Sequence, residues 1–377
     1  MRQQRASKGT MVVAALVAAL VLSLGLAACG GTTGGANEED ATVAEGGEVE
    51  GSLTISNWPG YIDPGKNGTV AEFESETGVN VDYIEDVNDN ETFLGKLRPQ
   101  LEQGDSGGRS IFVVTDWMAK EMFDLNYLQE LDPDSIPTVF ENMVPTLRDP
   151  SFDPGRKFSI PWQSGMTGIW VDTAKAPEIE SVNDLFDPKY RGKVTMLTEM
   201  RDTVPLVMKA EGVDPEEATN EDWLKAVDKI GAAADSGQIR RFTGNDYTED
   251  LTAGNIVAAI GWSGDASIVE NQSAEWRMPT EGCMLWSDNM VIPVGAPNVG
   301  AAYGWMDYVY QPEVAAKLAE YITYVSPVDG VKDLVKPELA KDELVFPSPE
   351  FQENCSTQDS PPEPEEVKEA WLGVVQG

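Results

Sequence analysis

Residues 53–61 read Leu-Thr-Ile-Ser-Asn-Trp-Pro-Gly-Tyr, a strand-like run that leads directly into a turn with two aromatic side chains. After residue 61, sequence patterns typical of helices alternate with patterns typical of strands. We predict helices over 69–77, 91–103 and 118–125, and strands over 79–83 and 111–114. This alternation predicts an α/β lobe with a mostly parallel sheet flanked by helices.

Aromatic and polar residues stand immediately after several predicted strands. Two of these strands lie in the first half of the chain, and two more, over 194–196 and 255–261, lie in the second half. The residues that follow them are Trp58, Tyr61, Thr115, Asp116, Trp117, Glu199, Asp202 and Trp262. Because ligands of open α/β sheets bind at the carboxyl ends of strands, these residues are candidates for a binding site.

A second stretch, residues 282–293, reads Gly-Cys-Met-Leu-Trp-Ser-Asp-Asn-Met-Val-Ile-Pro. On an extended segment, Trp286 and Asp288 point to the same side and present a flat apolar face together with a negative charge. Such pairs suit a ligand that is cationic and partly apolar. The alternative is structural, with Trp286 in the core, Asp288 as a cap and Asp202 as a helix N-cap.

The N-terminal residues have the pattern of a secretory signal. Three basic residues precede an apolar run over 11–26, and small residues surround Cys29. We predict a signal peptide over 1–28, a lipidated Cys29 and a Gly- and acid-rich flexible tether over 29–51. An uncleaved anchor helix is the alternative. Both readings place the remaining chain outside the membrane, attached to its outer face or in the periplasm.

The composition excludes several classes of function. The formal net charge is −37 and there is no histidine. Nucleic acid and bare anionic lipid are therefore unsuitable partners, and catalytic Ser–His or Cys–His pairs and histidine metal sites are absent. We predict no metal and no cofactor. Most of the acids are expected to solvate the surface.

The motifs of this chain, taken in order, resemble the spermidine/putrescine-binding proteins of bacterial ABC importers. The motifs are Asn57-Trp58-x-x-Tyr61, Val114-Thr115-Asp116-Trp117, Ser159-Ile160-Pro161, Lys189-Tyr190-Arg191-Gly192-Lys193, Trp286-Ser287-Asp288 and Tyr324. The resemblance implies a two-lobed periplasmic-binding-protein fold (type II) with two crossings between lobes. Residues 52–161 and 288–325 would form lobe 1, and residues 162–287 and 326–377 would form lobe 2.

The resemblance also implies the function and the site. It implies a monomeric receptor, not an enzyme, that captures a polyamine between aromatic rings and carboxylates and delivers it to an ABC permease. The implied ligand-binding residues are Trp58, Tyr61, Thr115, Asp116, Trp117, Glu199, Asp202, Trp262, Trp286, Asp288, Tyr324 and Gln352. The family usually has a hydroxyl residue and an acid where this chain has Pro59 and Gly60, and Asp116 is the predicted replacement for that acid.

Other functions remain open from the residues alone. A receptor for another cationic solute or for a sugar would also use Trp platforms, and a secreted glycosidase would combine Trp with two carboxylates.

The three cysteines allow one pairing if Cys29 carries lipid. Cys283 lies three residues before Trp286, and Cys355 lies three residues after Gln352. If those site residues line one cleft, the two cysteines come within bridging distance, so we predict a Cys283–Cys355 disulfide. Free buried thiols are the alternative.

Overall fold

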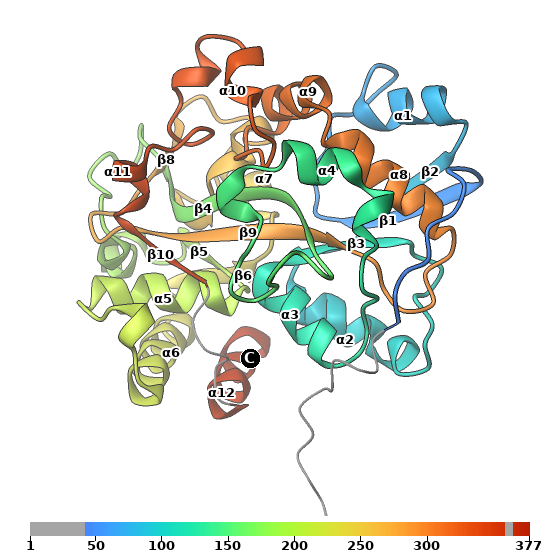
Figure 1. The fold of residues 1–377 in the computed structure, drawn as a ribbon. Coiled ribbons are helices and arrows are strands. Elements are labelled where there is room, and N and C mark those ends of the chain that lie inside the picture. Colours follow the sequence, from blue (N-terminus) through green and yellow to red (C-terminus); the bar gives the residue numbers. More distant parts are fainter. Residues whose placement is uncertain (1–41, 359–364) are drawn as a thin grey trace, which may run out of the picture. The chain divides into compact units, whose positions relative to one another are not determined.

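The first strand, β1 (Ser52–Asn57), pairs in parallel with β2 (Asn80–Glu85) on one side and with β3 (Ile111–Thr115) on the other (Figure 1). Leu53 and Ile55 point into the core and are fully buried. The helices that connect and follow these strands are α1 (Thr69–Thr77), α2 (Asn90–Leu101) and α3 (Asp116–Asp124). The predicted alternation of strand and helix is therefore confirmed for this part of the chain.

Two long antiparallel strands continue the sheet. β9 (Cys283–Val291) pairs with β3 at one edge and with β4 (Ile160–Asp172) at the other. The strand order is β2-β1-β3-β9-β4-β7-β5-β6, so β9 and β4 connect two groups of parallel strands. Nearly all residues of both strands are buried, as expected for the centre of a sheet covered on both faces.

The second parallel group consists of β5 (Val194–Leu197), β6 (Ile239–Thr243) and β7 (Ala258–Trp262). Two short strands pair off this path, β8 (Ala274–Arg277) with β4 and β10 (Cys355–Thr357) with β9. The helices of this region are α5 (Met200–Ala210), α6 (Asn220–Asp235) and α7 (Tyr247–Thr252). The predicted lobe boundaries, at 161/162 and 287/288, fall inside the continuous strands β4 and β9 and stay a prediction.

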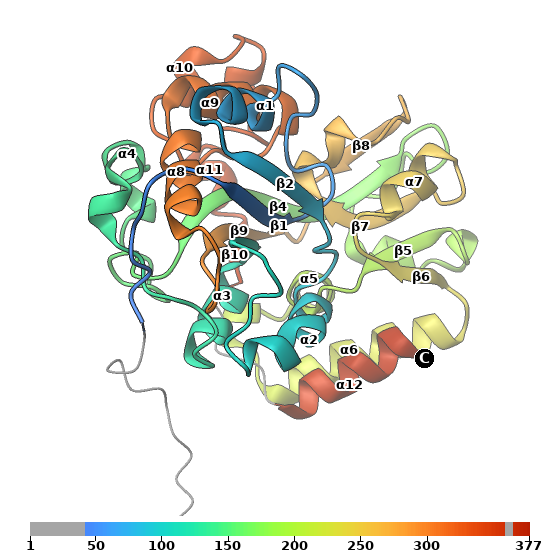
Figure 2. The same ribbon diagram turned by 90° about the vertical axis from the view of Figure 1, so that its right-hand side faces the viewer.

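Helices complete the chain after β9. They are α8 (Val299–Val309), α9 (Pro312–Ile322), α10 (Val331–Leu334), α11 (Pro349–Gln352) and α12 (Glu365–Gln376). One more helix, α4 (Pro137–Asn142), lies between α3 and β4. Figure 2 shows α12 lying along α6. Trp371 of α12 stacks edge-on against Phe242, and its indole N–H donates to the carbonyl of Thr198 at 2.8 Å.

Single-turn 3-10 helices lie in the connections. They are Pro133–Ser135, Pro145–Leu147, Val182–Phe186, Pro188–Tyr190, Pro215–Glu217, Ser263–Ser267 and Leu339–Lys341.

This computed structural model describes residues 42–358 and 365–377, all within one compact unit of residues 36–377. The predicted signal segment and Cys29 lie outside the described residues. The tether predicted to extend to Gly51 packs against the body from Thr42 onward: the N–H of Ala44 donates to the Glu130 carbonyl at 2.7 Å. None of the helices described is both long enough and apolar enough to span a bilayer.

Candidate functional site

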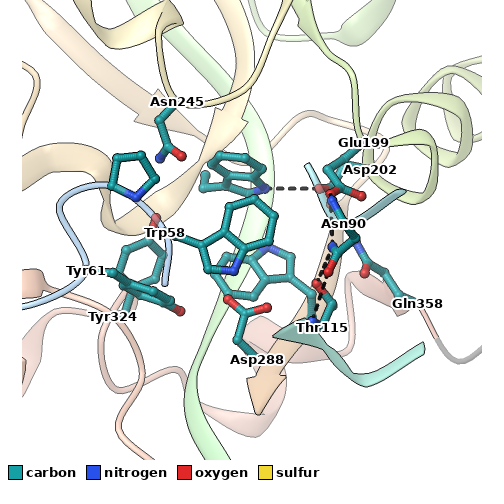
Figure 3. Close-up of a pocket in the computed structure, with 13 residues that line it drawn as sticks. Trp58, Tyr61, Asn90, Thr115, Glu199, Asp202, Asn245, Asp288, Tyr324 and Gln358 are labelled. Carbon is teal, nitrogen blue, oxygen red and sulfur yellow. Dashed lines mark hydrogen bonds between the residues drawn. The ribbon is translucent and has the colours of Figure 1, made fainter. Parts of the chain in front are cut away.

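A cavity lies where the strand ends of both parallel groups meet the middle of β9. Its lining is aromatic, acidic and amide-rich and consists of Trp58, Pro59, Tyr61, Asn90, Thr115, Glu199, Asp202, Asn245, Trp262, Trp286, Asp288, Tyr324 and Gln358 (Figure 3). The cavity between these side chains is small, with a volume of about 30 Å³. The walls therefore stand close together.

Strand ends supply most of this lining, as the sequence predicted. Trp58 directly follows β1, Thr115 is the last residue of β3 and Trp262 is the last residue of β7. Thr115 pairs with Asp288 in the register of β3 and β9, so the two side chains meet at the same level of the sheet. Trp286 lies two residues earlier on β9 and points to the same face.

The aromatic rings contact one another. Trp58 meets Trp262 edge-on, with ring centroids 5.6 Å apart and planes at 76°. Tyr324 lies 4.9 Å from Tyr61 and 5.5 Å from Trp286, again between centroids. A methylene chain held between two parallel ring faces needs them about 7–8 Å apart, because carbon atoms pack at about 3.5–4 Å. These rings must therefore separate or turn before such a chain fits between them.

Asp288 is the acid at the centre of the cavity and is 4 % exposed. Burial, together with the nearby charges of Asp116 and Asp202, raises its pKa to about 8. The hydroxyls of Thr115 and Tyr61 interact with the carboxylate and oppose this rise only in part. Asp288 thus lacks a cationic partner among the residues that line the cavity.

Asp202 accepts three hydrogen bonds. Its donors are the Thr167 hydroxyl at 2.5 Å, the Trp262 indole N–H at 3.0 Å and the Gln358 amide at 2.6 Å. Burial still raises the pKa of Asp202 to about 6, because these three donors are neutral.

Glu199 occupies the N-cap position of α5, and its side chain faces Asn90, the first residue of α2. Its Oε1 accepts both the backbone N–H of Asn90, at 2.6 Å, and the Asn90 side-chain amide, at 2.9 Å. Burial and the charges of Asp89 and Asp202 raise its pKa well above the usual value. In the view of Figure 3, Trp58 lies between the Tyr61–Tyr324 pair and the Glu199–Asp202 pair.

A further buried acid, Asp265, does not line the cavity but contacts the hydroxyl of Tyr324, which does. It accepts hydrogen bonds from the hydroxyls of Tyr324 at 2.7 Å and Tyr247 at 2.5 Å, and burial raises its pKa to about 6. Asn245 donates to the same carboxylate at 3.3 Å. Asp265 therefore orients two lining residues, Tyr324 and Asn245.

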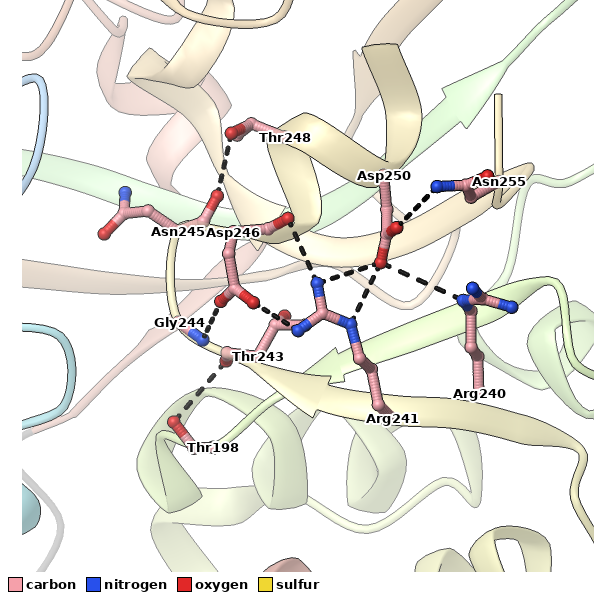
Figure 4. Close-up of polar contacts among 10 residues, drawn as sticks. All are labelled: Thr198, Arg240, Arg241, Thr243, Gly244, Asn245, Asp246, Thr248, Asp250 and Asn255. Carbon is pink, nitrogen blue, oxygen red and sulfur yellow. Dashed lines mark hydrogen bonds and ion pairs between the residues drawn. The ribbon is translucent and has the colours of Figure 1, made fainter. Parts of the chain in front are cut away.

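The loop that carries Asn245 is held by an ion-pair network (Figure 4). Arg241 on β6 pairs with Asp246 and, at 3.0 Å, with Asp250. Asp246 in turn accepts the N–H of Gly244 at 3.1 Å, and Thr248 donates to the Asn245 carbonyl at 2.8 Å. This network fixes the turn between β6 and α7 and so places the Asn245 side chain in the cavity.

The chemistry of the lining matches a cation. Asp288, Asp202 and Glu199 supply carboxylates, and neither lysine nor arginine is among the described residues that line the cavity. Two amide oxygens in it, Asn245 Oδ1 and Gln358 Oε1, are buried and accept no hydrogen bond from the described residues. They are ready acceptors for N–H groups of a ligand.

The structure brings most of the predicted site residues together. Those that line the cavity are Trp58, Tyr61, Thr115, Glu199, Asp202, Trp262, Trp286, Asp288 and Tyr324. Asp116, Trp117 and Gln352 do not line it. Asp116 accepts a hydrogen bond from Asn289 at 2.5 Å, Trp117 stacks under the Arg201 guanidinium at 5.0 Å, and Gln352 borders a separate pocket with Phe346.

Three amides of the lining were not predicted, namely Asn90, Asn245 and Gln358. Asn90 opens α2 after the N-cap Asp89, and Asn245 follows the strand end of β6, so strand and cap patterns could have indicated both. Gln358 occupies the place that the sequence analysis gave to Gln352. Gln352 ends α11, and β10 lies between it and Gln358 and carries the chain to the cavity.

The structure joins Cys283 to Cys355 in a disulfide, with Cα atoms 4.4 Å apart. Within the described residues no group of three or more Asp, Glu or Cys side chains is arranged to bind a metal ion.

Comparison with known proteins identifies the family. The family model for bacterial extracellular solute-binding proteins matches residues 68–347. The spermidine/putrescine-binding periplasmic protein 1 of Haemophilus influenzae is 26 % identical over 353 residues, which are 92 % of this chain and 93 % of that protein. The putrescine-binding periplasmic protein PotF of Escherichia coli is 30 % identical over 324 residues, covering 78 % and 83 % of the two chains.

Solved structures agree with this assignment. A putative spermidine/putrescine ABC transporter protein of Listeria monocytogenes superposes with a TM-score of 0.76 at 28 % identity, covering 86 % of this chain and 98 % of that chain. These relatives are substrate-binding transport proteins rather than enzymes. This chain belongs to the family of bacterial extracellular solute-binding proteins.

Proposed function

We propose that this protein binds a polyamine, such as putrescine or spermidine, and delivers it to the permease of an ABC importer. The observation that carries the proposal is the set of buried carboxylates, Asp288, Asp202 and Glu199, in a cavity lined by aromatic rings and by no basic side chain among the described residues. The names of the relatives point to the same class of ligand.

The charge argument favours a polycation over a neutral solute. A buried carboxylate without a cationic partner is costly, and the raised pKa values of Asp288 and Asp202 express that cost. Ammonium groups would pair with these acids, each charge-assisted hydrogen bond contributing about 1.5–3 kcal/mol. A sugar could stack on Trp58, Trp262 and Trp286, but it would leave the acids unpaired.

The aromatic walls suit the methylene stretches between ammonium groups. The rings come from the segment after β1, from β7, from β9 and from the segment after α9; they are Trp58, Tyr61, Trp262, Trp286 and Tyr324. An ammonium over a ring face adds about 0.5–2 kcal/mol. Because the rings now touch, ligand entry requires the two sides of the cavity to move apart and then close.

We further propose that the protein is lipidated at Cys29 and acts as a monomer. Cys29 precedes the described residues by a short segment that leads into the body at Thr42. Labelling of the full chain with a fatty-acid analogue, with Cys29→Ser as the control, tests this attachment. Loss of label in that variant is the expected result, and equal labelling would contradict it.

Titration calorimetry of residues 36–377 with putrescine and spermidine tests the ligand. We expect saturable one-to-one binding, with a Kd in the micromolar range or below, corresponding to about −8 kcal/mol or better. Asp288→Asn and Trp286→Ala should abolish it. Asp228→Asn, which makes the same charge change on the exposed face of α6, is the matched control and should bind as the wild type does.

Two outcomes would contradict the proposal. Absence of heat with both amines would exclude polyamines of this length. Saturable binding of a neutral sugar such as maltose, retained in Asp288→Asn, would instead support the stacking function of the rings without the carboxylates.

A further inference from the structure

Gln358 reaches the cavity from the end of β10. This strand pairs in parallel with the start of β9, with Cys355 opposite Cys283 and Thr357 opposite Leu285. The N–H of Gln358 continues the ladder and donates to the Leu285 carbonyl at 3.2 Å. Gln358 therefore lies beside the point where β9 turns Trp286 into the cavity.

The Gln358 side chain links the cavity to Asp202. Its amide N–H donates to Asp202 Oδ1 at 2.6 Å, while its Oε1 is buried and accepts no hydrogen bond from the described residues. The Gln358 carbonyl accepts a hydrogen bond from Arg201 at 2.7 Å. One residue thus orients a carboxylate and offers an acceptor to the ligand.

The strand that positions Gln358 is short. β10 spans Cys355–Thr357 and, among the described strands, pairs only with β9. β9 is held more firmly, since it pairs with β4 from Met284 to Met290 and with β3 from Asp288 to Val291. The Cys283–Cys355 disulfide connects the two strands at the first residue of each.

We propose that this disulfide sets the ligand affinity by holding β10 in register, so that Gln358 stays in the cavity and Asp202 keeps its hydrogen bond. The inference rests on the proposed function and adds a positioning role for a bond that does not itself touch the cavity. Opening the disulfide leaves β10 attached through a few hydrogen bonds, and Gln358 then leaves its place for part of the time.

The bond is open to reagents from one side. Cys283 is fully buried, but Cys355 is partly exposed and lines a surface pocket with Lys209, Glu216 and Glu281. A small dithiol such as dithiothreitol can therefore attack the Cys355 sulfur. Complete exchange oxidises the dithiol to its own disulfide and transfers two electrons and two protons to Cys283 and Cys355.

The test is a double-mutant cycle measured by calorimetric titration with putrescine and spermidine. The variants are Cys283→Ala/Cys355→Ala, Gln358→Ala, and both together. We expect Gln358→Ala to weaken binding about tenfold, the loss of roughly one hydrogen bond to a charged group, and the cysteine variant to weaken it measurably but by no more than that. The combined variant should bind no more weakly than Gln358→Ala, because both changes remove the same contact.

Further variants separate positioning from general destabilisation. Tyr61→Phe alters another wall of the cavity, so its effect should multiply with that of the cysteine variant. A glycine inserted between Thr357 and Gln358 keeps the disulfide but displaces Gln358, and it should weaken binding to the same extent as Gln358→Ala. If the cysteine variant does not fold, this insertion still tests whether the position of Gln358 sets the ligand affinity.

The outcomes are distinguishable. If the oxidised wild type binds neither amine, the proposed function fails. If it binds and the cysteine variant binds equally well, or the cysteine and Gln358 effects multiply, the positioning role is wrong. Unchanged binding by the insertion variant would likewise overturn it.

Discussion

At the scale of single residues, Asp288 governs the energetics of the cavity. Burial raises its pKa to about 8, so near neutral pH most molecules carry a protonated Asp288. An ammonium group in the cavity favours the carboxylate, and binding must therefore release a proton. Affinity for putrescine should rise between about pH 6 and about pH 9, where the amine stays charged.

Calorimetry in buffers of different ionisation enthalpy measures this proton release. We expect up to one proton released per ligand bound at neutral pH. Equal binding heats in phosphate and Tris, after correction for dilution, would show that Asp288 is already ionised in the free protein.

The same residue should limit stability. The folded-state pKa of Asp288 lies above its ordinary value of 3.8, so its contribution favours folding at low pH and is lost as the pH rises through about 8. Asn does not ionise, so Asp288→Asn removes this loss of stability at high pH. We expect the variant to be more stable than the wild type by about 1–3 kcal/mol at alkaline pH, with a smaller difference in acid.

Urea unfolding at two pH values tests the prediction, with the exposed Asp228→Asn as the control. A variant that is less stable than the wild type at alkaline pH would mean that Asp288 has a stabilising partner. The expected combination, higher stability with lost binding, is typical of residues kept for function.

Which site residues the sequence could indicate depended on local geometry. Trp286 and Asp288 could be predicted as site residues because alternate residues of a strand share a face. Trp117 and Asp116 also follow a strand, but α3 begins at Asp116 and turns both side chains toward Arg201 and Asn289 instead. Gln358 could not be identified because the disulfide-linked pairing of β10 with β9, rather than any local pattern, brings it to the cavity.

At the scale of elements, β4 shows why some of the fold was not predicted. It contains Pro161, Gly165 and Gly168, and proline and glycine argue against predicting a central strand from the sequence. The glycines serve packing: a Cβ on Gly165 would lie 2.5 Å from the Trp286 ring and 3.0 Å from the Tyr324 ring. In α8, likewise unpredicted, Gly300 makes room for the backbone of residues 47–48.

This packing gives a prediction for Gly165→Ala. The added methyl group must push Trp286 and Tyr324 into the cavity, because both rings are confined by neighbours. We expect about tenfold or greater loss of putrescine affinity and about 1–3 kcal/mol loss of stability. Titration calorimetry and thermal melting measure the two effects.

Gly95→Ala is the matched control. Gly95 lies inside α2, and a Cβ there meets no atom within 4 Å. Its substitution should leave binding unchanged and raise stability by about 0.5–1 kcal/mol. If Gly165→Ala bound putrescine as tightly as this control, the rings would be free to move away from β4.

At the scale of the whole molecule, acids greatly outnumber bases. With 64 acidic and 27 basic residues, a net charge of −37 stays uncompensated even if every base contacts an acid. Several bases serve two acids at once. Lys368 of α12 contacts Glu91 of α2 at 3.3 Å and Glu121 of α3 at 3.1 Å, and Lys317 contacts Glu72 at 2.7 Å and Asp63 at 3.8 Å. The negative charges in excess repel one another and attract polycations.

Salt should therefore act in opposite directions on folding and on binding. From about 0.01 M to about 1 M NaCl the screening length falls from about 30 Å to about 3 Å, which weakens both repulsion among surface acids and attraction of the amine. We expect the melting temperature of the ligand-free protein to rise by about 2–5 °C over this range. Over the same range, the association rate and affinity for spermidine should fall, more steeply than for putrescine, because spermidine carries one more charge.

Thermal melts and titrations in NaCl and in KCl separate screening from binding of a particular ion, since screening depends only on ionic strength. Equal effects of the two salts would support the view that the electrostatic field of all the charges in the chain causes the changes in melting temperature and affinity. A melting temperature that falls with salt would show instead that paired contacts such as those of Lys368 outweigh the repulsion. An affinity independent of salt would confine the attraction to Asp288, Asp202 and Glu199, whose burial shields them from screening.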